Sequence, residues 1–175
     1  MKEMTTMTLI VENGSKVTGA NTYISLADAR TRATALGVTI SSTDADAESQ
    51  LIRATLYVDR KYRARYQGYK VDETQALQFP RVYVVVDDYM IDSDEIPQEL
   101  IDAQVYAAAE LEAGNSFYTN NDGRSVASEQ VTGAVSVSYF NTGKRGSQIA
   151  FTAVEDTIRP LLASGTGKTS YLVRS

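Results

Sequence analysis

The spacing of apolar residues predicts a long amphipathic helix over residues 47–62. The positions that recur at helical spacing are Leu51, Ala54, Val58 and Tyr62, and Ile52 and Leu56 widen this stripe. A stripe of this width is typical of a helix that packs along one side against a core. The other side of the helix carries arginines and a lysine. We therefore expect this helix to be the central element of the fold, with one buried face and one basic face.

A second helix is predicted over residues 25–36 from its end signals. Ser25 lies three positions before Asp28, which is the arrangement of a capping box, and Gly37 follows the last apolar residue. A serine side chain satisfies free N–H groups at a helix start, and glycine adopts the left-handed conformation that commonly ends a helix. Residues 39–46 are polar and are expected to form a loop to the long helix.

Two more helices are predicted towards the end of the chain. One begins at Pro97, has acidic residues in its first turns and ends before Gly114. Proline suits the first position of a helix, and acidic side chains are favourable near its positive end. The other helix covers residues 154–163. Pro160 lies inside it, so we expect this helix to be kinked or shorter.

Four segments are predicted to be β-structure. Residues 7–11 and 16–18 flank an Asn-Gly pair, which favours a tight turn and therefore a short N-terminal hairpin. Residues 82–86 are rich in valine and are closed by two aspartates, as expected for a strand or an extended arm. Residues 131–139 alternate apolar and polar positions, which indicates a strand with one packed face.

Together these elements predict a mainly α fold. We expect a small helical bundle with a short N-terminal hairpin, a β-strand or hairpin arm, a C-terminal helix and an extended tail. The chain has 175 residues, a length that suits a single domain over 1–175. Within it, residues 7–113 form the N-terminal hairpin and helical core, residues 114–153 the loop and β arm, and residues 154–175 the C-terminal helix and tail.

The composition excludes several kinds of chemistry. The chain contains no cysteine and no histidine, which removes thiol nucleophiles, zinc–thiolate sites and the commonest general base near neutral pH. No apolar run approaches the roughly 20 residues that span a bilayer. We therefore expect neither an enzyme nor a protein that uses a cofactor, a metal or a membrane, and we expect it to be made in the cytoplasm.

Two motifs resemble ligand-binding sequences only superficially. Residues 164–170 look like the end of a phosphate-binding loop, but Leu162 stands where that loop needs a glycine, and the chain ends soon afterwards. The acidic residues Asp87, Asp88, Asp92, Asp94 and Glu95 could supply oxygen ligands. They lack the spacing and the distal glutamate of a calcium loop, so solvated acids near a helix start are the favoured interpretation.

Charge is strongly segregated along the chain. Residues 53–81 contain seven basic and three acidic residues, a net charge of +4, whereas residues 82–112 contain nine acidic residues and no basic one. The whole chain has a formal charge of -5. This balance argues against a protein whose main task is to grip nucleic acid, because phosphate binding needs a basic surface, although it leaves room for a local basic patch.

Arginines interleaved with Tyr57, Tyr62 and Tyr66 allow two interpretations of the basic helix. Arginines beside stacking aromatic rings suit a single-stranded nucleic-acid platform. The favoured alternative is that the tyrosines pack at the edge of the core while the arginines pair with acids. That pairing can join two protomers head to tail, because surfaces of opposite sign on one protomer suit a heterologous interface. The predicted subunit interface comprises Arg53, Arg60, Arg63, Arg65, Asp87, Asp88, Asp94 and Glu95.

Several segments together resemble a family of tailed-phage proteins. They are residues 7–14, 19–29, 51–59, the Gln-Ala-Leu-Gln-Phe-Pro-Arg run at 75–81, and the Ile-Pro pair at 96–97 before an alanine-rich helix. The family resembles head-to-tail connector adaptors, also called head completion proteins, and many of its members are labelled DnaT-like single-stranded DNA-binding proteins. Phe79 stands where many members have tryptophan.

The resemblance implies a structural virion protein at the head–tail junction. A homo-oligomeric ring, dodecameric by this resemblance, would bind the portal protein and tail or neck proteins and would surround a channel for double-stranded DNA, without sequence-specific binding. The tail residues implied to bind the portal are Lys168, Tyr171, Leu172 and Arg174. The label of many members leaves a second hypothesis open, namely a replication accessory that coats single-stranded DNA. The two differ in the affinity for single strands and its loss with salt.

Overall fold

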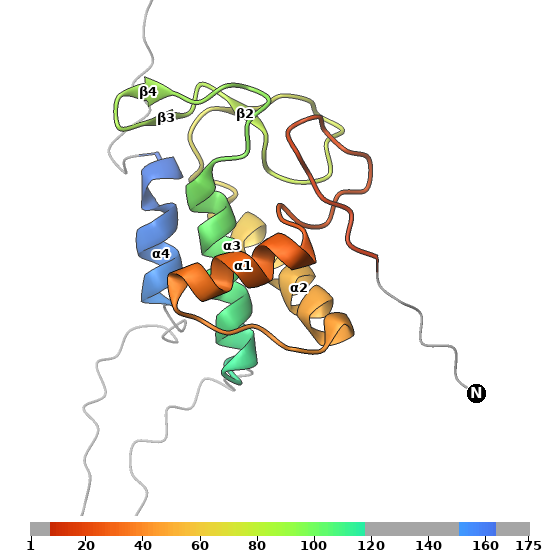
Figure 1. The fold of residues 1–175 in the computed structure, drawn as a ribbon. Coiled ribbons are helices and arrows are strands. Elements are labelled where there is room, and N and C mark those ends of the chain that lie inside the picture. Colours follow the sequence, from red (N-terminus) through yellow and green to blue (C-terminus); the bar gives the residue numbers. More distant parts are fainter. Residues whose placement is uncertain (1–7, 118–150, 164–175) are drawn as a thin grey trace, which may run out of the picture.

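The computed structural model describes residues 8–117 and 151–163, which form a mainly helical fold (Figure 1). Its helices are α1 (Leu26–Leu36), α2 (Asp44–Tyr62), α3 (Gln98–Glu112) and α4 (Thr152–Ile158), followed by the 3-10 turn η1 (Arg159–Leu161). Its strands are β1 (Tyr69–Lys70), β2 (Arg81–Val82), β3 (Val85–Val86) and β4 (Tyr89–Met90). The predicted fold class is confirmed. Of the described helices, none is both long enough and apolar enough to cross a membrane.

Helix α3 lies at the centre of the helical layer and packs against α1, α2 and α4 (Figure 1). Ala103, Ala107 and Ala108 on α3 have no exposed surface. Their small side chains let the neighbouring helices approach closely, because no bulky group separates the backbones. The alanine-rich run of the sequence therefore marks the packing centre, while α2 contributes the largest set of buried side chains.

Helix α2 has the predicted buried stripe but begins three residues earlier than expected, at Asp44. Leu51, Ala54 and Val58 are completely buried, and Tyr62 is 1% exposed. Full burial of these apolar side chains is the main stabilising contribution of the helix. The stripe ends at Tyr62, and residues 73–74 form a turn.

The end signals of α1 are confirmed. The Ser25 hydroxyl accepts a hydrogen bond from the Asp28 amide at 3.2 Å and donates one to the Asp28 carboxylate at 2.6 Å. Gly37 ends the helix in the left-handed conformation, with φ of 71°. These contacts satisfy backbone groups that a helix leaves free at each end.

The β-structure consists of two small antiparallel pairs at one end of the helical layer (Figure 1). In one pair Tyr69 lies opposite Val82, and in the other Val86 lies opposite Tyr89. The single strand predicted over 82–86 is thus split between β2 and β3. Tyr83, between them, has a φ of 60°, which breaks the extended backbone.

The predicted N-terminal hairpin is wrong for the described residues. Instead, the Glu12 carboxylate accepts hydrogen bonds from the backbone N–H groups of Gly14, Lys16 and Val17, each at 2.9 Å. Residue 11 forms an isolated bridge with Thr22. Glu12 is 1% exposed, so this loop is organised around one buried carboxylate rather than around a strand ladder. A carboxylate can take over N–H groups that a hairpin would pair.

The segment 75–81 fastens the end of α2 to β2. The Arg81 guanidinium, 7% exposed, donates to the carbonyl oxygens of Gln67 and Gly68, both at 2.7 Å. The Gln75 amide donates to the carbonyl oxygens of Leu77 and Pro80, both at 3.0 Å. The peptide bond before Pro80 is cis. Arg81 therefore has a structural role, since its planar fork is used on backbone carbonyls.

The C-terminal helix is shortened as expected, because Pro160 lies in η1 after α4 ends at Ile158. Phe117 and Phe151 both pack on Tyr57, with ring centroids 4.1 and 5.8 Å from it. The two described ends of the chain on either side of 118–150 therefore meet on α2. The strand predicted over 131–139, most of the predicted loop and the tail lie outside the described residues.

Candidate functional site

An exposed stripe on α2 is the first candidate interaction surface. It consists of Arg53, Leu56, Arg60 and Arg63, and we call this set the α2 stripe. Its members are three or four positions apart, which places them along one side of the helix. Leu56 is 39% exposed, so the prediction that it widens the buried face is wrong, whereas Ile52 is 8% exposed as expected.

The cations of the α2 stripe have no acidic partner among residues 8–117 and 151–163. The ion pairs found there are Arg30–Asp44, Arg32–Asp102, Lys61–Glu155 and Arg159–Asp156. Arg65, the fourth arginine of the predicted interface, lies over the Tyr62 ring at 5.9 Å. Pairing of these arginines with acids of the same protomer is therefore not found in the described part of the chain.

The tyrosines interleaved with these arginines are packed inside the protein. Tyr57, Tyr62 and Tyr66 are 8%, 1% and 6% exposed. Tyr66 packs edge-on against Phe79, with ring centroids 5.2 Å apart. Burial raises the pKa of Tyr62 to about 12. The interpretation that these rings pack in the core is confirmed, and they are not available to stack on nucleic-acid bases.

Lys61 is a basic residue of α2 that is not free. Its ammonium donates to the Tyr57 hydroxyl at 2.8 Å and to the Glu155 carboxylate at 2.7 Å. Burial lowers the pKa of Lys61, but the hydrogen bonds to Glu155 and Tyr57 raise it by more. This ion pair ties α4 to α2, so we assign Lys61 to the internal structure and not to a surface site.

A buried carboxylate, Asp59, lies behind the α2 stripe. It accepts hydrogen bonds from the Tyr23 hydroxyl at 2.8 and 3.0 Å and from the backbone N–H of Gln78 at 2.9 Å. Burial raises the pKa of Asp59 and these hydrogen bonds offset part of the rise, so that the resulting pKa is about 6. Groups with such shifts are candidates for catalysis, but they also occur in structural networks. Because Asp59 is only 7% exposed and joins three segments, we assign it a structural role.

Exposed apolar residues gather on the two β pairs. Tyr69, Tyr83, Tyr89 and Met90 are 72%, 66%, 77% and 66% exposed. The sequence did not predict that these residues are exposed, because an aromatic residue in a short strand is equally compatible with a buried and an exposed position. The only local signal is their position beside turns. Large side chains this exposed are unusual enough to indicate a contact surface.

The structure divides the acidic half of the predicted interface between two places. Asp87 and Asp88 form the turn between β3 and β4, and both are exposed. Asp94 and Glu95 belong to the segment before α3 and line a groove. The predicted interface residues are therefore distributed over the α2 stripe, a hairpin turn and a groove rim, and they do not form one cluster within the protomer.

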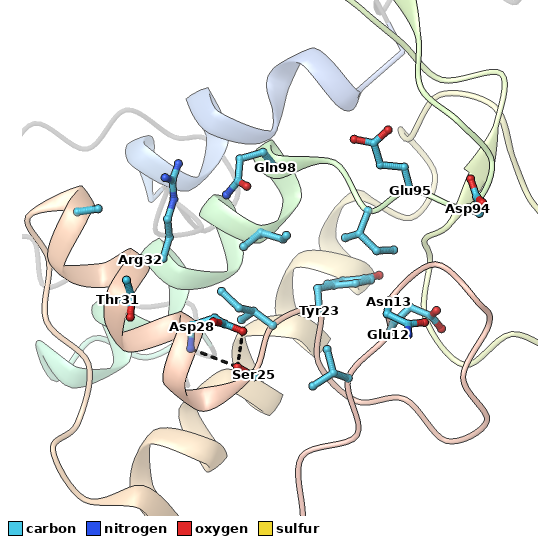
Figure 2. Close-up of a pocket in the computed structure, with 15 residues that line it drawn as sticks. Glu12, Asn13, Tyr23, Ser25, Asp28, Thr31, Arg32, Asp94, Glu95 and Gln98 are labelled. Atoms are coloured by element: carbon cyan, nitrogen blue, oxygen red, sulfur yellow. Dashed lines mark hydrogen bonds between the residues drawn. The ribbon is translucent and has the colours of Figure 1, made fainter.

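The groove has a volume of about 840 Å³ and lies between α1, the loop at residues 11–13 and the segment that enters α3. Figure 2 shows Asp28 on one side of this groove, Asp94 and Glu95 on another, and Tyr23 between them. Arg32, on α1, is bound to both oxygens of Asp102, at 2.7 and 2.6 Å. A groove with apolar lining and carboxylates at its rim is suited to an apolar and basic peptide, because each part of such a peptide finds its complement.

The described residues contain no group of three or more acidic side chains arranged to hold a metal ion. The proposed portal-binding residues Lys168, Tyr171, Leu172 and Arg174 lie outside the described ranges. Within those ranges the exposed groups described above are guanidinium groups, aromatic rings and carboxylates.

The fold and these surfaces define a mainly helical protein that presents charged and aromatic contact surfaces. Residues 7–175 match the model of a family described as "Putative DnaT-like ssDNA binding protein", and the chain belongs to this family. Searches of curated proteins and of solved structures give no significant match. The family description supports the single-stranded DNA-binding hypothesis more directly than the connector hypothesis, since it says nothing of a connector.

Proposed function

We propose that this protein is a structural subunit of a tailed-phage neck, which assembles into a homo-oligomeric ring between the portal and the tail, around the DNA channel. The observation that carries this proposal is the separation of exposed charges. The α2 stripe presents three arginines without an acidic partner in the described residues, while Asp87 and Asp88 are exposed on the β3–β4 turn. Free charges of opposite sign on separate surfaces support association between copies.

The burial of the α2 tyrosines also supports this choice. A single-strand platform on α2 and the residues just after it would need Tyr57, Tyr62 or Tyr66 at the surface, but all three are at most 8% exposed. The formal charge of -5 further disfavours a protein that coats a polyanion along its length. A channel wall, by contrast, must let DNA slide and gains from acidic groups that repel phosphate.

The wider assembly rests on the resemblance to connector adaptors. The partners we propose are the portal protein, reached through Lys168, Tyr171, Leu172 and Arg174, and neck or tail proteins on the other side. The ring would have twelve subunits by the same resemblance. The protein would be made in the host cytoplasm and would function in the virion without catalysis or cofactor.

Electron microscopy of purified virions and of the isolated protein tests this proposal. We expect rings at the head–tail junction, labelled by an antibody against the protein, and ring-shaped particles that dissociate as salt is raised. Complete absence of the protein from intact virions would refute the neck assignment.

Single-stranded DNA binding is the second candidate, and the family description favours it. The structure offers a small surface for it on β1. Tyr69 is 72% exposed. The ammonium of its neighbour Lys70 donates to the Gln75 carbonyl at 2.9 Å, so the exposed ring is the group that can stack on a base here.

Fluorescence anisotropy with a labelled 30-nucleotide strand separates the two candidates. A single-strand-binding protein should lose affinity steeply with salt, and Tyr69→Ala should weaken it by about 1–3 kcal/mol, the usual value of one stacked base. Under the connector proposal we expect only weak binding that is equal for single and double strands. Tight, strand-selective binding would favour the accessory.

A further inference from the structure

The β3–β4 hairpin projects apolar side chains from a firmly anchored base. Tyr89 and Met90 are 77% and 66% exposed, whereas Val84 and Val86 on the same segment are 0% and 8% exposed. The side-chain amide of Gln67 also holds the hairpin. It donates to the Val85 carbonyl at 3.1 Å and accepts from the backbone N–H of Val85 at 3.2 Å. The hairpin is therefore held in place, although a hairpin alone is marginally stable.

The turn of this hairpin carries two carboxylates in a fixed geometry. Asp87 and Asp88 have φ angles of 50° and 68°. Two successive positive φ angles are typical of the tight turn whose twist matches that of the paired strands. Both side chains are exposed. The tip of the hairpin is thus acidic and its flank is aromatic.

Tyr83 extends the same surface at a cost in backbone strain. It has a φ of 60° and is 66% exposed. A bulky residue in the left-handed region is strained, and such residues concentrate at functional sites. Burial of the Tyr83 ring in the protomer does not offset this strain, because the ring points largely into solvent.

The α2 stripe is the chemical complement of this hairpin. Arginines surround a half-exposed Leu56, and guanidinium groups both pair with carboxylates and stack on tyrosine rings. Within one protomer no ion pair joins Asp87 or Asp88 to the stripe in the described residues. Figure 1 shows the hairpin beyond one end of the helical layer, to which α2 belongs.

We propose that the β3–β4 hairpin of one copy docks on the α2 stripe of a second copy. The aspartates then meet the arginines, and Tyr89 packs against Leu56 and the stems of its neighbouring arginines. The two surfaces differ, so the contact is head to tail and can close into a ring. This inference rests on the self-association in the proposed function and identifies the surfaces that carry it. The two carboxylates at the tip disfavour nucleic acid as the occupant.

Paired charge reversals test this contact. One variant combines Asp87→Lys with Asp88→Lys, and the other combines Arg60→Asp with Arg63→Asp. Each alone places like charges together, so we expect self-association at least about tenfold weaker, because like charges at an interface cost several kcal/mol. An equal mixture of the two should associate again, since each hairpin then meets a stripe of opposite charge. Native mass spectrometry and sedimentation velocity measure both effects.

Three control variants separate the contact from other causes. Asp94→Lys with Glu95→Lys makes an equal charge change at the groove rim and should leave association unchanged. Asp87→Asn with Asp88→Asn keeps residues that tolerate positive φ and should weaken association partially. Tyr89→Ser should weaken association without a change of charge, and its melting temperature should equal that of the unaltered protein.

Three results would overturn this contact without deciding the ring proposal. The first is self-association of both charge-reversed variants that is as strong as that of the wild type. This result leaves the ring proposal standing. The second is failure of the mixture to associate. The third is a loss of monomer stability in Tyr89→Ser without weaker association, which would mean that another segment of the same chain covers the hairpin. A wild-type protein that stays monomeric at every concentration, also with its portal present, overturns both this contact and the ring. Virion microscopy alone decides the neck location.

Discussion

The buried Asp59 carboxylate predicts an unusual dependence of stability on pH. Burial raises its pKa from 3.8 to about 6, so the folded protein binds this proton more tightly than the unfolded chain does. Stability from this group is therefore fully present below about pH 3.8 and is lost as the pH rises through about 6. The difference between the two pKa values corresponds to about 3 kcal/mol that the ionised carboxylate costs at neutral pH.

The substitution Asp59→Asn isolates this effect because asparagine does not titrate. Its amide meets the donor groups of Tyr23 and Gln78 differently, but that change is independent of pH. We expect the free energy of unfolding of the wild type, relative to the variant, to fall by about 2.4 kcal/mol between about pH 4 and 7.5, because part of the full loss already occurs below pH 4. Urea unfolding followed by far-ultraviolet circular dichroism, at low protein concentration and high salt, measures it.

A matched control comes from Asp72→Asn, at an exposed carboxylate. Hydrogen bonds from the Thr74 side chain and backbone lower the pKa of Asp72, so its contribution has the opposite sign and is lost only as the pH falls below the usual aspartate range. Over the same pH window we expect the difference in the free energy of unfolding between wild type and Asp72→Asn to stay constant. If the free energy of unfolding of the wild type relative to Asp59→Asn stayed constant or rose as the pH was raised, the assigned role of burial would be refuted.

Two further substitutions test the packing of the fold by urea unfolding. Gly68→Ala should cost at least about 2 kcal/mol, because Gly68 has a φ of 60° and an added Cβ would lie 1.8 Å from the Val82 carbonyl oxygen; Gly37→Ala, with nothing within 4 Å, should cost about 1 kcal/mol. Phe79→Ala should cost about 3–5 kcal/mol since Phe79 is 1% exposed, whereas Tyr69→Ala, at 72% exposure, should stay within about 0.5 kcal/mol. Equal losses within either pair would contradict the packing described.

The exposed hairpin surface illustrates what sequence patterns miss. Tyr62 and Tyr89 are both tyrosines in segments rich in apolar residues, yet one is 1% and the other 77% exposed. Helical spacing assigned Tyr62 to the packed side, as the structure confirms. No comparable period exists in a strand of two residues. Tyr89 lies opposite Val86, which is 8% exposed, so the exposure of Tyr89 depends on how the edge of the hairpin packs in the tertiary structure.

The N-terminal loop shows the same limit from the polar side. The Asn-Gly pair correctly indicated a turn, but the partner of the neighbouring N–H groups was decided by the buried Glu12 carboxylate. A turn signal describes a few adjacent residues. Whether strands pair around it depends on competing acceptors, and these become available only when the chain is packed.

The sequence by itself determined the helices, because apolar spacing and end signals act within a few residues of each other. It placed the buried stripe of α2, both ends of α1 and the break at Pro160. It also revealed that positive and negative charge lie in different segments. Only the tertiary structure decided that Tyr66 is packed inside while the arginines of the α2 stripe remain without a described acidic partner. Burial and pairing depend on contacts between segments far apart in the chain, so local spacing cannot specify them.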